Sequence, residues 1–248
     1  MQNYNDYLSQ LELADAPLLM DSEFFESLSS EKSDDSEAGF VAYKGLQSFA
    51  AGVSVQNRED VLNSLLLAQR AASKSFPNEK DIFKWYEKYF EVLENVGWVL
   101  EGKDFSKFAS SHNKFDVHKA LLEILGAAVT AGQLAIVMKT LSALKDMADQ
   151  DGRITFFERN THTSHKGSFQ VGVADEVNGT VSLSANAFIL STETTITKIL
   201  FFTSARNEAE LNYCLAKATL NSNVYATYRE QIIAKLTDNS QYIADLDI

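Results

Sequence analysis

Residues 117–141 read VHKALLEILGAAVTAGQLAIVMKTL, and this stretch decides how the rest of the chain is interpreted. Its apolar residues recur at helical spacing on both sides of a break bracketed by Gly126 and Gly132, which predicts a pair of helices. Only Lys139 and Lys145 interrupt the apolar character of the second helix. A helical pair with such a wide apolar face needs a surface that buries it.

The sequence after Asp151 supplies that surface, because the apolar spacing changes there from the helical period to the alternation of strands. The segments are rich in β-branched and aromatic residues and are bounded by turn residues. Asn178–Gly179 is a strong signal for a two-residue hairpin turn. The predicted strands are RITFFERN (153–160), GSFQVGVADEV (167–177), GTVSLSANAFIL (179–190), TTITKILFFTSA (194–205) and ELNYCLAKATLN (210–221).

Another helical pair is predicted nearer the N-terminus, with Asn57 as the N-cap of its first helix and Pro77 between the two helices. Residues 39–45 are expected to form an edge strand, residues 97–111 an extended segment, and residues 223–236 a closing helix. We therefore expect the α+β class, with an antiparallel sheet wrapped by two helical hairpins in α/β/α layers. The predicted apolar stripe of the helix after Pro77 consists of Ile82, Trp85, Tyr86, Tyr89, Phe90 and Leu93.

The net charge of −12 is unevenly distributed along the 248 residues. Residues 1–38 hold ten acidic residues and one lysine, whereas the remaining residues hold 24 acidic and 21 basic residues. We expect two parts, an acidic and flexible leader over residues 1–38 and a single domain over residues 39–248. One interpretation of the leader is a flexible acidic tail. The other is a pro-segment or a docking peptide. Neither part has the basic excess of a nucleic-acid-binding protein.

The single cysteine, Cys214, excludes an intrachain disulfide. The N-terminus lacks a cationic start followed by an apolar core, as a secretory signal would have. No apolar run approaches the roughly 18 residues of a membrane-spanning helix. The expectation is a soluble protein that is released or secreted by a non-classical route.

The stretch 146–158, DMADQDGRITFFE, resembles a calcium-binding loop when Gly152 takes the central turn position. Met147 then occupies the first ligand position and offers no carboxylate, and the predicted strand that follows would remove the second helix of such a motif. Calcium binding is therefore not expected. His162 and His165 are expected to be exposed at a hairpin tip. No catalytic or nucleotide-binding motif occurs, so we expect a non-enzymatic protein without catalytic residues, metal or cofactor.

Cys214 allows two interpretations. A cysteine within a predicted strand usually behaves as a small buried apolar residue. The alternative is S-acylation, in which a covalent fatty acyl chain would add membrane affinity.

The order of helical hairpin, extended segment, helical hairpin and long strands resembles the Cyt-type cytolysin fold of the Cyt δ-endotoxins, volvatoxin-like toxins and Evf-type bacterial virulence factors. Four stretches between about residues 57 and 235 carry the resemblance. They are LNSLLLAQRAASKSFP, the helical pair quoted first, RITFFERNT as an aromatic strand, and TITKILFFTSARNEAELNY with its L-F-F-T signature.

The resemblance implies a membrane-active toxin or virulence factor whose helices move away from the sheet and free it for lipid. Its expected partners are membrane lipids and further copies of the chain on the membrane, with no nucleic acid. The predicted strand ITKILFFT is the candidate membrane-interacting strand, through Ile196, Leu200, Phe201 and Phe202. Two alternatives stay open. One is a non-lytic virulence effector that carries a fatty acyl group or binds lipid, and the other is a protein-interaction module that docks through its acidic leader.

Overall fold

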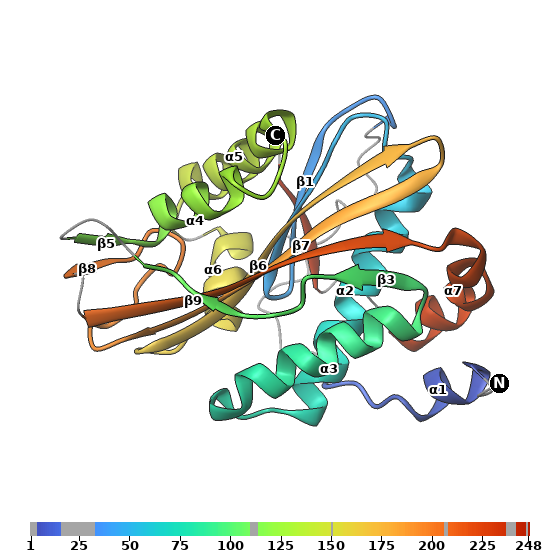
Figure 1. Ribbon diagram of the computed structural model, residues 1–248, viewed down its shortest axis with the longest axis horizontal. Coiled ribbons are helices and arrows are strands. Elements are labelled where there is room, and N and C mark those ends of the chain that lie inside the picture. The colour runs from blue at the N-terminus through green and yellow to red at the C-terminus, as the bar shows by residue number, and fades with distance from the viewer. Residues whose placement is uncertain are drawn as a thin grey trace.

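The computed structural model describes residues 4–15, 33–109, 114–149, 151–205, 208–236, 242–246 and 248. Helices pack around a mostly antiparallel sheet, which confirms the α+β class (Figure 1). The helices are α1 (Tyr4–Gln10), α2 (Val55–Ser75), the short 3-10 helix η3 (Glu79–Asp81), α3 (Ile82–Asn95), α4 (Val117–Gly126), α5 (Ala131–Asp146), α6 (Gly152–Thr161) and α7 (Ser222–Leu236). The strands are β1 (Ala38–Ala42), β2 (Gly45–Phe49), β3 (Trp98–Glu101), β4 (Ser106–Lys107), β5 (Lys114–Asp116), β6 (Lys166–Val177), β7 (Thr180–Thr192), β8 (Thr203–Ala205), β9 (Ala209–Leu220) and β10 (Ile243–Leu246).

The main sheet has the order β10-β1-β2-β6-β7-β9-β3, and β4 also pairs with β9. Among the described strands of this sheet, only β2 and β6 pair in parallel. The predicted hairpin is confirmed between β6 and β7, where Asn178 and Gly179 have φ values of 53° and 74°. These left-handed conformations suit a two-residue turn, and Asn and Gly adopt them readily. The prediction that residues 39–45 form an edge strand is wrong, because β10 pairs along β1.

The two predicted helical hairpins lie on opposite faces of the sheet (Figure 1). On one face, the Thr140 hydroxyl of α5 lies 2.8 Å from the Ser48 hydroxyl of β2. On the other face, the Tyr86 hydroxyl of α3 accepts a hydrogen bond of 3.3 Å from Gln170 Nε2 of β6. The N-cap of α2 is Ser54, three residues before the predicted cap, because Ser54 Oγ accepts a hydrogen bond from the Asn57 amide.

The prediction of a strand over residues 153–160 is wrong, because these residues belong to helix α6. Asp151 caps this helix by accepting a hydrogen bond of 2.8 Å from the Arg153 amide. Ile154, Phe157 and Thr161 are buried at helical spacing, so packing against the sheet decides the local structure.

The candidate calcium loop therefore does lead into a second helix, contrary to the reason given for rejecting it. Its carboxylates are nevertheless committed to other groups. Asp149 pairs with Lys198 at 2.5 Å, Asp151 pairs with Arg153, and Glu158 accepts a hydrogen bond of 2.9 Å from the Ile199 amide. Within the described part of the chain, no group of three His, Cys, Asp or Glu side chains is arranged to hold a metal ion.

Part of the leader packs onto the domain. In α1, Leu8 and Leu11 are buried, and Tyr7 Oη lies 3.4 Å from Glu91 of α3. The Ala14 amide donates to the Arg70 carbonyl of α2 at 3.0 Å. Residues 16–32 of the leader lie outside the described residues.

Candidate functional site

The face of the β7–β9 pair that lies toward α3 is apolar over most of its length, whereas the other face is polar and exposed only at the end near the β6–β7 turn. Successive strand residues point to opposite faces of a sheet, so alternation along the sequence separates the two sides. On the face away from α3, Ser182, Lys217 and Thr219 are exposed, whereas Phe188, Leu190 and Leu211 are buried. The face toward α3 ends in the half-buried polar residues Ser191, Glu210 and Asn212, and its remaining residues are all buried: Val181, Leu183, Ala185, Ala187, Ile189, Cys214, Ala216, Ala218 and Leu220.

The paired length of β7 and β9 matches the thickness of a bilayer. Their register runs from Ser182–Thr219 to Thr192–Ala209, which is 11 residue pairs. A strand of about 9–11 residues crosses the hydrocarbon core of a membrane when it is tilted. The pair therefore has the length of a membrane-crossing strand, together with one face that is apolar over most of that length.

The apolar face of the pair lies beneath the aromatic residues of α3. Tyr86 and Tyr89 are buried close enough to Cys214 of β9 to interact electrostatically with its thiol, and burial raises the pKa of both phenols. Tyr86 also donates a hydrogen bond of 3.3 Å to the Phe169 carbonyl of β6. The predicted apolar stripe of α3 is thus confirmed, and it serves as the cover of the sheet.

The tip of the α2–α3 hairpin is fastened to the segment between β3 and β4. The ring of Phe83 meets Phe105 at a centroid distance of 5.3 Å and an interplanar angle of 90°. Phe105 also contacts Tyr86 at 5.2 Å. At the other end of α3, Glu94 pairs with Lys103 at 2.6 Å. These contacts between α3 and the β3–β4 segment are non-covalent: two are aromatic ring contacts, and one is a solvent-exposed ion pair.

Cys214 lies fully buried on the apolar face of β9, and its Sγ donates to the Gly102 carbonyl at 3.4 Å. Burial raises the pKa of this thiol to about 12, so the unreactive protonated form dominates near neutral pH. Gly102 has φ of 74°, and a Cβ there would lie 2.8 Å from the Leu215 carbonyl oxygen. Only glycine lets the β3–β4 connection approach β9 so closely.

The expected strand around Ile196, Leu200, Phe201 and Phe202 is wrong. Residues 193–202 form bends and turns, and only Thr203–Ala205 forms the short strand β8. The Ile196 amide donates to the Ser164 carbonyl at 2.8 Å, away from any sheet ladder. Ile196, Leu200 and Phe202 are buried, and half-buried Phe201 lies 5.6 Å from the His118 ring. These residues pack together in the fold, and membrane contact by them remains a prediction.

The two histidines of the predicted hairpin tip differ in environment. His165 is exposed as expected. His162 is instead the C-cap of α6, where its Nε2 lies 3.0 Å from Glu158 Oε2 and its side chain is only 13% exposed. The Glu158 carboxylate raises the pKa of His162 by stabilising its charged form.

The β7–β9 face was missed as a site by the sequence analysis, although the alternation in VSLSANA signals it. None of the helices in the described ranges is both long enough and apolar enough to cross a membrane.

No protein-family model and no curated protein matches the sequence. Three solved structures are similar to it. A delta-endotoxin shares 11% identity with a TM-score of 0.45, covering 84% of this chain and 91% of that chain. The activated Cyt2Ba monomer from Bacillus thuringiensis subsp. israelensis shares 11% identity with a TM-score of 0.34, covering 54% and 79%. The Evf virulence factor shares 13% identity with a TM-score of 0.36, covering 99% and 91%. Two of the groups named in the sequence resemblance, the Cyt endotoxins and the Evf virulence factors, are thus among the similar structures.

Proposed function

We propose that the chain is a membrane-active toxin or virulence factor in which the α2–α3 hairpin leaves the sheet and the β7–β9 pair enters a bilayer. The observation that carries the proposal is the strand pair of 11 residue pairs whose α3-covered face is apolar over most of its length. In water the aromatic residues of α3 cover the apolar face. In the membrane, lipid acyl chains replace the aromatic residues of α3. The apolar face of the β7–β9 pair therefore stays out of contact with water in both states.

Insertion of these strands also calls for several copies of the chain. Backbone groups in hydrocarbon must all be hydrogen-bonded, and an open strand edge leaves a row of them without partners. Adjacent copies on the membrane supply the missing strands, which makes the proposed active form a homo-oligomer.

Liposomes test this function directly. Full-length protein and protein lacking residues 1–38 are added to vesicles loaded with a self-quenching dye, and leakage and co-sedimentation are measured. We expect both forms to sediment with the vesicles and to release dye, the truncated form faster because it lacks α1. Failure of both forms to bind vesicles or release dye would contradict the proposal.

The fatty-acyl alternative rests on the position of Cys214. Its thiol points into the apolar layer between β9 and α3, which suits a hydrocarbon chain chemically. Complete burial means that an acyl group would have to be attached before α3 closes over the strand. Intact mass of protein from its native producer decides this alternative, since an acyl chain adds a defined mass and a free thiol adds none.

A further inference from the structure

A cavity of about 630 Å³ opens at the end of the sheet opposite the β6–β7 turn. Its walls come from the β1–β2 turn, the tip of the α2–α3 hairpin, the C-terminal end of α6, and the adjoining ends of β6, β7 and β9. The volume lies in the range of small-molecule sites. Trp85, Ile82, Ile189 and Leu190 form apolar parts of the wall.

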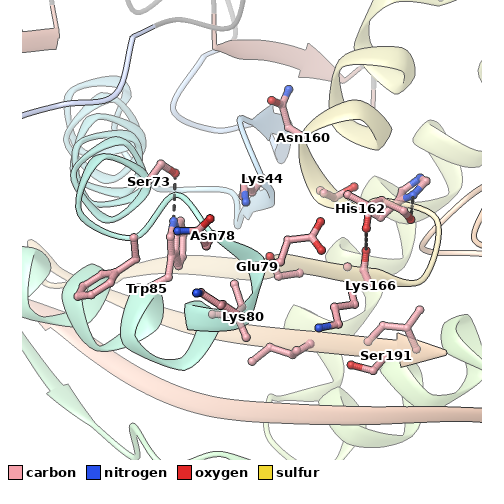
Figure 2. A pocket seen from close by; sticks show the side chains of 18 of the residues that line it. Lys44, Ser73, Asn78, Glu79, Lys80, Trp85, Asn160, His162, Lys166 and Ser191 are labelled. Atoms are coloured by element: carbon pink, nitrogen blue, oxygen red, sulfur yellow. Dashed lines mark hydrogen bonds between the residues drawn. The ribbon is translucent and has the colours of Figure 1, made fainter.

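Four basic residues from separate elements line this cavity: Lys44, Lys80, Arg159 and Lys166. Figure 2 shows Lys44, Lys80 and Lys166 around one space, with Glu79 among them. Among the described residues, none of these four cations forms a salt bridge. The other carboxylate of the wall, Glu210, is paired with Lys107 outside the cavity. Four cations therefore face a single unpaired carboxylate, in a protein whose net charge is −12.

Lys44 is the inner cation, and its backbone is held in place. Tyr43 before it adopts φ of 52° in the β1–β2 turn. The Lys44 amide donates to Gln69 Oε1 of α2 at 2.9 Å, and its carbonyl accepts from the Gln170 amide of β6 at 3.0 Å. The ammonium lies 5.4 Å from the centre of the Trp85 ring. A cation fixed in advance loses little conformational freedom when an anion binds.

Two other parts of the wall are also fixed. Trp85 Nε1 donates to Ser73 Oγ at 3.0 Å, and Thr163 Oγ1 donates to the Lys166 carbonyl at 3.4 Å (Figure 2). Lys166 and Arg159 are exposed at the rim, so an anion can reach them from solvent. Clusters of lysine and arginine with nearby hydroxyl and amide groups are the usual protein environment of phosphate.

We propose that this cavity binds a phosphate group, carried either by a small phosphorylated compound or by a lipid headgroup. Lys44 contacts the group from inside, and Arg159 and Lys166 enclose it from the rim. Binding at this cavity does not depend on the entry of β7 and β9 into a bilayer, so it goes beyond the proposed function.

Calorimetric titration with inorganic phosphate tests the site in the full-length protein. Wild type should bind, and Lys44→Gln and Lys166→Gln should each weaken binding by about tenfold, as expected for loss of one charge-assisted contact. Lys119→Gln is the matched control, because this lysine lies on α4 with a side chain 77% exposed. Circular dichroism checks the fold, and Lys80→Gln at an exposed rim position provides a further variant if Lys44→Gln does not fold.

Vesicles of phosphatidylcholine with and without phosphatidic acid identify the source of the phosphate. Binding to phosphatidic acid that inorganic phosphate displaces supports a lipid headgroup, and binding of inorganic phosphate alone supports a small phosphorylated compound. The proposal is overturned if inorganic phosphate does not bind, or if Lys119→Gln weakens its binding as much as Lys166→Gln. Binding to phosphatidic acid that is insensitive to inorganic phosphate, while inorganic phosphate itself binds, excludes a lipid headgroup and supports a small phosphorylated compound. Dye leakage from pure phosphatidylcholine vesicles, measured in parallel, shows whether membrane activity survives independently.

Discussion

Arg229 of α7 donates two hydrogen bonds to Asp60 of α2, at 2.8 Å to Oδ1 and 2.6 Å to Oδ2. The Asp60 side chain is only 1% exposed, so its carboxylate depends on this partner for compensation of its charge. The pair joins the helical layer that covers the sheet to the last helix. Under the proposed function, this contact breaks when the α2–α3 hairpin moves away from the sheet and from α7.

Removing the arginine should destabilise the protein strongly. Arg229→Gln leaves a buried carboxylate without its ion-pair partner, which typically costs about 3–5 kcal/mol. Chemical denaturation should show this loss in the free energy of unfolding. The control Lys84→Gln removes an exposed cation whose pair with Asp81 is 3.4 Å long, and should change stability by less than about 0.5 kcal/mol. Equal losses in the free energy of unfolding would show that the Arg229–Asp60 pair does not stabilise the fold.

Substitution at Gly102 should expose Cys214. Gly102 and Gly179 both have φ of 74°, but a Cβ at Gly179 meets no atom within 4 Å whereas one at Gly102 would overlap the Leu215 carbonyl. Gly179→Ala should therefore cost about 1 kcal/mol through backbone strain alone, and Gly102→Ala at least about 2 kcal/mol. The rate at which an aromatic disulfide reagent modifies Cys214 should rise only in Gly102→Ala. An unchanged rate would mean that the β3–β4 connection does not shield the thiol.

The α1 helix should restrain the helical cover. Leu8 is 3% exposed, and Lys88 of α3 lies 5.6 Å from the centre of the Tyr7 ring. Leu8→Ala should weaken this docking by about 2 kcal/mol and speed dye release from liposomes. Glu12→Ala changes an exposed residue of the same segment and should behave as wild type. Slower release from Leu8→Ala would show that α1 assists membrane action instead of restraining it.

Much of the fold could be predicted where local chemistry and burial agree. The apolar stripe of α3 and the Asn178–Gly179 turn depend on local spacing and backbone conformation, and both are confirmed. Residues 153–160 are rich in aromatic and β-branched residues, which predicts a strand. Two signals for a helix compete with that composition: the helical spacing of Ile154, Phe157 and Thr161, and the N-cap at Asp151. Helix propensity is a weak signal that packing overrides.

The sites were harder to predict than the fold. The segment around Ile196–Phe202 is apolar on both of its possible strand faces, so its sequence could not separate a strand from a packed turn. The cations of the cavity lie far apart in sequence, at positions 44, 80, 159 and 166, and only the tertiary structure brings them together. Single charged residues in a sequence do not indicate which of them lie close together in the folded protein.

Phosphate binding should depend on the protonation of Lys44. Burial lowers the pKa of its ammonium to about 8, while Glu79 opposes that shift. Because only the charged form attracts phosphate, affinity should be high at about pH 7 and fall as the pH rises through 8 to about 9, well below the range of an ordinary lysine. The other groups around the cavity that carry or can carry charge are Lys80, Arg159, His162, Lys166 and Glu210.

Calorimetry at the two pH values measures this dependence. Lys44→Gln should show a smaller fall in affinity between them, whereas Lys166→Gln, with Lys44 intact, should retain the fall. An affinity in wild type that stays constant over this interval would contradict a direct contact between Lys44 and phosphate.

The most direct test of membrane action is to cross-link the tip of the α2–α3 hairpin to the segment between β3 and β4. Phe83→Cys and Phe105→Cys, combined with Cys214→Ala, replace two rings whose centres lie 5.3 Å apart, and a short bis-maleimide can join them. Asp81→Cys and Lys84→Cys, joined in the same way within the hairpin tip, provide the control. The account predicts that the 83–105 cross-link abolishes dye release from liposomes while the 81–84 cross-link leaves it intact. Unchanged dye release from the 83–105 cross-linked protein would contradict it.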